Sequence, residues 1–168
     1  WSSDVCSSDL TISKDKVKIT DLTGMYGEDQ LTSVERIKFY DRTIALDLDG
    51  NAGKVAKLLG ATFGKSALSN KEYVGTGLNL IDSGMSYQDL AVLAVKVTKK
   101  SNPTDICTLL WTNVMGKKPS DSDIAPFKSQ LETGQISVGA LTMMAADSAY
   151  NTNNINLVGL ANTGIEYV

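Results

Sequence analysis

The amino-acid sequence predicts a mainly α-helical fold, in which duplicated three-helix units form one helical domain behind a short β-hairpin or meander. Three observations support this fold class. From about residue 49 onward, apolar residues recur with the period of a helix. The helical part then repeats itself at a spacing of 52 residues. Before residue 48, apolar and polar residues alternate as they do in strands.

The segment 11–48 is expected to form a β ribbon. The run KVKIT (16–20) alternates polar and apolar residues and is followed by a glycine-rich turn. The runs VERIKF (34–39) and TIALDL (43–48) supply further strand candidates. A ribbon of two or three short strands is marginally stable alone, so we expect it to pack on another part of the protein.

N-capping residues mark the starts of the expected helices in the segment 49–168. The expected starts are Asp49 or Asn51, Ser69 with Glu72, Ser86 with Asp89, Asn102 before Pro103, about Ser122, Ser137, and Asn151 or Asn154. Proline is tolerated in the first turn of a helix, so Pro126 is expected within the first turn of the fifth helix.

The internal repeat is clearest where an apolar helix ends in Gly-Lys. LLGATFGK (58–65) matches LWTNVMGK (110–117), and the two copies extend over about 55–100 and 106–150. Each copy is too small to bury an adequate core by itself. We therefore expect the two three-helix units to stack face to face and share one core.

Residues 1–10, WSSDVCSSDL, resemble a translated short-read sequencing adapter, because every codon of a common adapter fits them. We expect this segment to be non-native and disordered, and the chain to be a fragment, of the kind that metagenomic sequencing yields, whose upstream region is missing. The alternative is a genuine serine-rich, disordered N-terminus.

Composition excludes several classes of function. The formal net charge is −3 and aromatic residues make up 7% of the chain, so there is no basic footprint for nucleic acid. No apolar run approaches the length of a membrane span. The chain has no histidine, which removes the commonest general base and most zinc sites. Cys107 lies in an apolar run and is expected to be a small buried hydrophobe. We expect no catalytic residues, no enzyme activity and no bound cofactor other than calcium.

Calcium is the metal that the carboxylates suggest. Asp47 and Asp49 begin like a calcium loop, but an EF-hand starting at Asp47 would need glycine and glutamate where Ala52 and Leu58 stand. The alternative is a turn that caps the following helix. Asp21 and Asp29 border a glycine-rich turn similar to the edge of calcium-loaded β-rolls, or else to a solvated turn.

One stretch resembles a known family. The pattern L-x-x-V-E-R-I-x-F-x-D, followed by A-L-D, is similar to the junction before a C-terminal helical domain of unknown function in large bacterial RTX-type, hemolysin-type calcium-binding exoproteins. The matching residues are Leu31, Val34, Glu35, Arg36, Ile37, Phe39, Asp41, Ala45, Leu46 and Asp47. The helical continuation is similar too, so the resemblance extends over residues 15–168.

The resemblance implies a secreted or cell-surface bacterial protein, exported by a type I system, with this segment at its C-terminus. The family's glycine-aspartate repeats are missing from this chain, and its helical domain has no established catalytic residues. The expected function is a non-enzymatic accessory domain that caps the upstream β-roll of the same chain and supports export or surface attachment. One alternative is a module that binds a cell-surface glycan or S-layer component, with Tyr26, Tyr73, Tyr87 and Trp111 as platforms. Another is a non-catalytic part of a larger exported enzyme.

Overall fold

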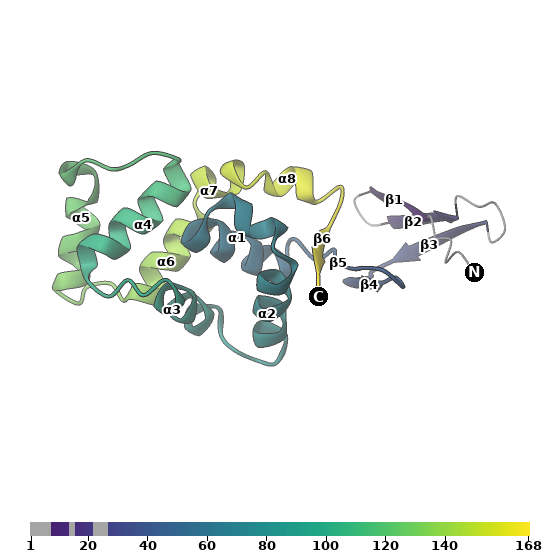
Figure 1. Ribbon diagram of the computed structural model, residues 1–168, viewed down its shortest axis with the longest axis horizontal. Helices are drawn as coiled ribbons and strands as arrows, with labels where there is room; N and C mark the ends of the chain where they lie inside the picture. The colour runs from purple at the N-terminus through teal and green to yellow at the C-terminus, as the bar shows by residue number, and fades with distance from the viewer. Residues whose placement is uncertain (1–7, 14–15, 22–26) are drawn as a thin grey trace.

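The structure is a computed structural model that describes residues 8–13, 16–21 and 27–168. It is mainly helical, with strands before the helices, as the sequence predicts; the short strand near the C-terminal end of the chain was not expected. Figure 1 shows the N-terminal sheet at one end of the elongated molecule and helix α5 at the other. No helix in the described ranges combines the length and the apolar character that crossing a lipid bilayer requires.

The N-terminal sheet is an antiparallel meander of three strands in the order β1-β2-β3. These strands are β1 (Ser8–Ser13), β2 (Lys16–Asp21) and β3 (Glu28–Thr32). Val17 is its one buried residue among those with described side chains, and β3 is exposed except at Leu31. Residues 8–10 were expected to be disordered but pair in β1 with 19–21 of β2, because they extend an alternating strand; residues 1–7 lie outside the described part.

A second antiparallel sheet joins distant parts of the sequence in the order β4-β5-β6. Its strands are β4 (Arg36–Lys38), β5 (Thr43–Ala45) and β6 (Ile165–Tyr167). The central strand β5 buries Ile44 and Ala45, and β6 buries Ile165 beside them. The ribbon expected over 11–48 is therefore two sheets, and the second takes one strand from the far end of the chain.

The helical domain contains the predicted repeat. The first copy comprises α1 (Asn51–Phe63), the 3₁₀ helix η1 (Lys65–Ser69), α2 (Lys71–Asp82) and α3 (Tyr87–Val97); the second comprises α4 (Pro103–Met115), α5 (Asp121–Glu132) and α6 (Val138–Asp147). Helices α4, α5 and α6 begin 52, 50 and 51 residues after α1, α2 and α3. Equivalent helices have nearly equal lengths, which supports the interpretation of an internal duplication.

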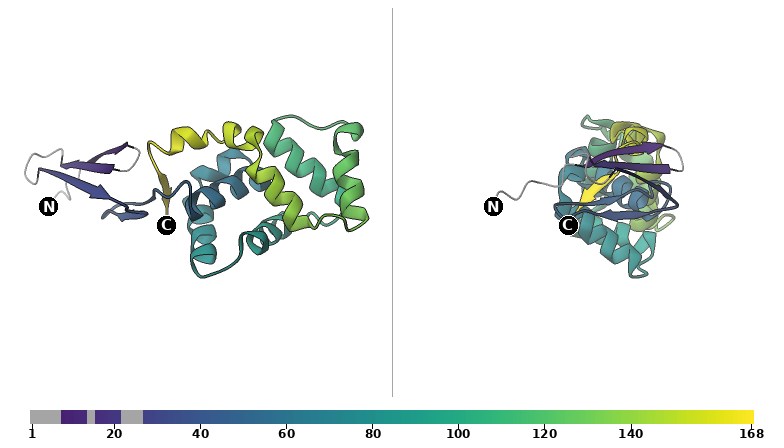
Figure 2. Two further views of the ribbon diagram at one scale, coloured as in Figure 1. Left: turned by 180° about the vertical axis from the view of Figure 1, so that it is seen from behind. Right: turned by 90° about the vertical axis from the view of Figure 1, so that its right-hand side faces the viewer.

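The two copies pack through their first and third helices. Helix α3 packs on α6, and α1 packs on both α4 and α6. The α2 and α5 helices lie on the outside of this arrangement, at different ends of it (Figures 1 and 2). One continuous core of buried side chains, including Leu58, Leu78 and Leu110, runs through both copies.

The last helices return the chain across α1 to the second sheet. They are α7 (Ala149–Asn154) and α8 (Leu157–Leu160). The fully buried Asn151 amide donates to the backbone oxygens of Lys57 and Ala146, at 2.9 and 2.8 Å. Gly60 makes room for it, since a Cβ there would lie 2.9 Å from Asn151 Oδ1. The expectation that Asn151 or Asn154 caps the start of α7 is wrong. Ser148 caps this helix, and the Asn151 side chain is buried in the core.

Other helix starts confirm or correct the sequence predictions. Ser86, Asn102 and Ser137 cap α3, α4 and α6 as expected. Asn70, and not Ser69, caps α2, because its side chain reaches two backbone N–H groups. Ser120 caps α5 two residues before the expected start, which places Pro126 at the sixth helical position and outside the first turn.

Candidate functional site

The candidate site is the junction where the ribbon meets the first helical copy. We call it the clasp: Arg36 at the start of β4, Asp47 after β5, and Asp82 at the end of α2. The Arg36 guanidinium forms an ion pair with Asp47 and a second, at 3.2 Å, with Asp82. The Asp47 side chain is only 10% exposed, whereas that of Asp82 is 46% exposed. The clasp thus ties the sheet to two helices.

Asp47 also stabilises the start of α1. The N-cap position is Gly50, which has no side chain to accept a hydrogen bond. Asp47 Oδ2 instead accepts from the Ala52 backbone N–H at 3.1 Å, and its backbone oxygen accepts from Gly50 and Gly53. The expectation that Asp49 or Asn51 caps this helix is therefore wrong. A carboxylate near an N-terminus also compensates the positive end of the helix dipole.

Asp82 is the part of the clasp that sequence reasoning missed. As the last residue of α2, its negative charge meets the negative end of the helix dipole, which is unfavourable. Arg36 offsets that charge, and the Asn51 amide donates to its other carboxylate oxygen at 2.8 Å. An acidic residue at a helix C-terminus was the available signal, since its charge is unfavourable there unless a cation offsets it.

The C-terminal strand secures the same junction from the other side. Strand β6 pairs with β5, and its Glu166 forms an ion pair with Lys71 at the start of α2. The Val168 N–H donates to the Lys71 carbonyl at 3.3 Å, and the backbone there lies against Gly75, where a side chain would collide with Val168. The second sheet is consequently attached to both ends of α2, to its start through Lys71 and to its end through Asp82.

The predicted calcium ligands do not converge in the described part of the chain. Asp29 lies exposed on β3, and Asp49 lies exposed in the turn before α1. The Asp47 carboxylate already forms an ion pair with Arg36 and accepts a hydrogen bond from the α1 backbone. Among the described residues, no three acidic, histidine or cysteine side chains gather closely enough to hold a metal ion. The Asp21 side chain lies outside the described residues, so calcium binding at the glycine-rich turn stays a prediction.

Cys107 is a free thiol in the core, 4% exposed. Burial raises the pKa of this thiol, the nearby Glu132 carboxylate raises it further, and Lys128 opposes them. A thiol with a raised pKa stays protonated near neutral pH and is a poor nucleophile.

The aromatic residues proposed as glycan platforms have other surroundings. The Tyr73 ring packs on Phe63 with ring centroids 5.4 Å apart, although Tyr73 is 45% exposed. The Tyr87 hydroxyl donates to Asp147 at 3.3 Å, and burial, together with that carboxylate, raises the pKa of the phenol. Trp111 lines an apolar groove. Tyr26 lies outside the described residues. Tyr40, which the sequence reasoning did not single out, is 95% exposed at the turn after β4.

Lys57, Tyr87 and Asp147 form a second polar cluster, at the contact between the two copies. Lys57 of α1 lies 2.6 Å from the Asp147 carboxylate at the end of α6, and Tyr87 of α3 contacts the same oxygen. Asp147 ends its helix as Asp82 does, and its charge is likewise offset by a cation from another element, here Lys57 of α1. This cluster links three helices and serves their packing.

Comparison with known proteins adds no relative. No protein-family model matches the sequence, and neither a curated protein nor a solved structure is detectably similar to it.

Proposed function

We propose that this chain is a non-enzymatic accessory domain of a secreted bacterial RTX-type protein, which caps a β-roll and supports export or surface attachment. The clasp carries the proposal. The strand ribbon leads directly into the helical domain. It is held there by the ion pairs of Arg36 with Asp47 and Asp82, and by the pairing of the C-terminal strand with β5.

The physical need for such a cap lies in the ribbon. Its sheet of β1–β3 buries little apolar surface in the described part, so it gains little stability from its own packing. Stacked β repeats also require a terminal element that ends the stack and protects its edges. A helical domain with its own core, fixed to the last strands, meets both requirements.

The resemblance supports the same proposal independently. The pattern residues Arg36 and Asp47 are the two that form the partly buried ion pair of the clasp. The pattern's Ile37 is a buried residue of β4, and its Ala45 is fully buried in β5. The stretch that resembles the exoprotein junction is therefore the stretch that attaches ribbon to helices.

The test joins a designed β-roll of tandem G-G-x-G-x-D repeats to the N-terminal side of Thr11 and titrates it with calcium. Formation of β structure is followed by circular dichroism, with the same repeats lacking the domain as reference. If the domain is a cap, the repeats fold at a lower calcium concentration when it is attached. Equal midpoints with and without the domain would rule out capping.

Two variants make the test specific to the clasp. Arg36→Ala removes the cation that holds the ribbon and is expected to diminish the calcium shift. Lys128→Ala removes the cation that pairs with Glu132, the residue of the second copy that is equivalent to Asp82. It is expected to leave the shift unchanged. If both variants act alike, the clasp has no special part in capping.

A further inference from the structure

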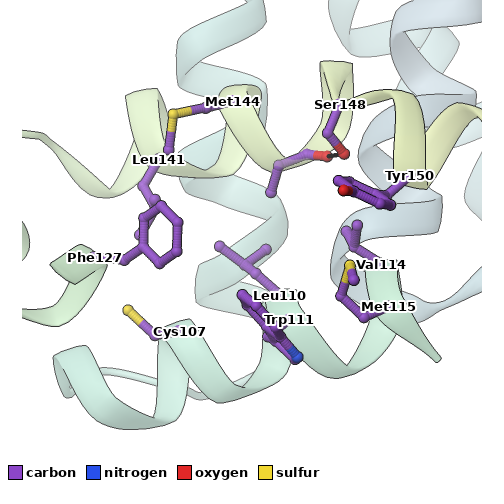
Figure 3. A pocket seen from close by; sticks show the side chains of 11 residues that line it. Cys107, Leu110, Trp111, Val114, Met115, Phe127, Leu141, Met144, Ser148 and Tyr150 are labelled. Carbon is purple, nitrogen blue, oxygen red and sulfur yellow. Dashed lines mark hydrogen bonds between the residues drawn. The ribbon is translucent and has the colours of Figure 1, made fainter. Parts of the chain in front are cut away.

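Each helical copy has an apolar groove among its helices. The groove of the second copy encloses about 320 Å³, and that of the first about 190 Å³. Figure 3 shows the larger groove, with α4 side chains along one side, α6 and α7 side chains along the other, and Phe127 of α5 at one end.

The two grooves are equivalent positions of the repeat. Trp111 and Met115 of the second groove stand 52 residues after Leu59 and Phe63 of the first. The α6 residues of the second groove stand 51 residues after α3 residues of the first. These pairs are Leu141 with Leu90, Met144 with Leu93, and Ala145 with Ala94. The groove is therefore a feature of the duplicated unit and not an accident of one loop.

The first copy fills its groove with its own side chains. Tyr73 of α2 packs its ring on Phe63 of α1. Gly77 lets α2 approach α1 closely, because a Cβ there would lie 2.7 Å from Val55. The smaller volume of the first groove follows from these two features.

The second copy lacks both features. Asp123 stands where the first copy has Tyr73, and its carboxylate turns to the helix start, accepting from the Ser120 N–H at 2.8 Å. Phe127 stands where the first copy has Gly77, so α5 carries a large ring at the position where α2 has no side chain. The larger groove thus lacks an equivalent of the Tyr73 ring, and the ring that α5 does supply, Phe127, lies at one end of the groove.

The chemistry of the lining selects an uncharged apolar occupant. None of the described residues that line the groove is charged. The Ser148 hydroxyl already donates to the Ala145 carbonyl at 2.7 Å, and the Cys107 thiol is held protonated by burial. Beside Cys107, Lys128 and Glu132 lie 3.8 Å from each other as an ion pair. Small-molecule sites in proteins typically combine such apolar and aromatic walls with few polar groups.

The dimensions of the groove select a narrow, extended occupant. Its α4 wall runs from Cys107 to Met115, which spans about 12 Å at the helical rise per residue. A volume of about 320 Å³ over that length corresponds to a cross-section of about 27 Å², little more than one alkyl chain. Since an apolar cavity of about 150 Å³ holds one benzene, this volume suits about twelve carbon atoms.

We propose that the groove of the second copy binds a single unbranched alkyl chain of about eight to twelve carbons that carries an uncharged head group. The chain lies along α4 between Cys107 and Met115. The unbranched Met144 and Met115 side chains adapt to it. The head group emerges beside Met144 and Tyr150, which are 47% and 66% exposed.

The first experiment uses the full chain with Trp1→Phe, which leaves Trp111 as the only tryptophan. Straight-chain 1-alkanols from six to fourteen carbons are titrated as monomers, with Trp111 fluorescence and calorimetry as readouts. Affinity is expected to rise up to about fourfold per added methylene, because each buried methylene contributes about 0.8 kcal/mol, and to level off near twelve carbons. 1-Adamantanol, of similar carbon number but greater width, is expected to bind at least about tenfold more weakly than 1-decanol. Non-saturable binding, or binding without dependence on chain length, would overturn the proposal.

Matched variants use the repeat as an internal control. Ala145→Phe places a ring in the second groove and is expected to abolish saturable 1-decanol binding. Ala94→Phe places the same ring at the equivalent position of the first groove and is expected to change the dissociation constant less than about twofold. Equal losses in the two variants would contradict the assignment to the second groove.

A further measurement does not depend on how Ala145→Phe folds. In a Cys6→Ser variant, Cys107 is the only thiol, and saturating 1-decanol is expected to slow its alkylation by iodoacetamide at least about fivefold by covering it. Unchanged alkylation would overturn the proposal. So would retention of the Trp1→Phe chain on phosphatidylcholine vesicles without saturable binding of the free alkanol, because the apolar surface would then serve membrane attachment.

Discussion

The first helices of the two copies begin in opposite ways. Helix α4 caps itself: the Asn102 side chain accepts from the Asp105 N–H at 2.8 Å, and Pro103 occupies the first turn. Helix α1 has glycine at the same position and takes its carboxylate from Asp47 in the ribbon. The second copy therefore contains its own start signal, whereas the first depends on a segment outside the repeat.

The C-terminal ends of the second helices, α2 and α5, differ in the same way. Asp82 closes α2 and Glu132 closes α5, at equivalent positions 50 residues apart. Asp82 is paired with Arg36 of the ribbon, whereas the partner of Glu132 among the described residues is Lys128, one turn earlier on its own helix. Exposed i,i+4 pairs contribute only a few tenths of a kcal/mol. The helix ends of the first copy thus find their partners in the ribbon, whereas those of the second copy find them on nearby residues of the same helix.

The largest expected effect comes from matched core truncations. Leu58→Ala removes a 2% exposed side chain that packs between helices and is expected to cost about 4 kcal/mol. Leu110→Ala removes the equivalent side chain, which borders the larger groove and so has fewer contacts to lose; we expect about 2.5 kcal/mol. Urea unfolding of both variants measures the difference, with an unchanged m-value as control. Equal losses would show that Leu110 is packed as tightly beside the larger groove as Leu58 is in the first copy.

Matched cap removals come next. Asp47→Ala removes the α1 cap and the partner of Arg36, and is expected to cost about 2–3 kcal/mol. Asn102→Ala removes only a cap and is expected to cost about 1 kcal/mol. Both free energies of unfolding come from denaturant titration. A double-mutant cycle with Arg36→Ala isolates the ion pair, since its members should be non-additive. Costs of the same size for both caps would contradict the dependence of α1 on the ribbon.

The smallest expected effect is on how the stability of the protein changes at acid pH. Hydrogen bonds from Ser120 lower the pKa of the Asp123 carboxyl in the α5 capping box. A carboxyl whose pKa is lower in the folded protein contributes stability above its unfolded pKa, and this contribution is lost as pH falls through the folded pKa. In Ser120→Ala, the Asp123 pKa is expected to rise toward the ordinary aspartate value, measured by NMR of the carboxyl carbon. The equivalent cap in the first copy is Asn70, whose amide does not titrate, so Asn70→Ala should leave the acid dependence unchanged. An unaltered Asp123 pKa in Ser120→Ala would disprove the assigned cause.

Part of the candidate site could be predicted from the sequence. Arg36 and Asp47 both stand in the pattern that resembles the exoprotein junction, and Asp47 was singled out as a polar side chain with a role before the first helix. Its partner could not be predicted, because the register of β4 against β5 places Arg36 beside it. Asp82 comes from a helix that ends 35 residues later, and no local pattern connects it to either residue.

What the sequence by itself determined is the chemistry that acts over a few residues. The helical period, the caps at Ser86, Asn102 and Ser137, and the order of the repeated helices all depend on neighbours within one or two turns. The tertiary structure decided the pairing of β6 with β5, the burial of Asn151 against α1 and the unequal volumes of the two grooves. Those features depend on which distant segments meet, and a local pattern does not record that choice, since the same capped amphipathic helix can pack in several ways.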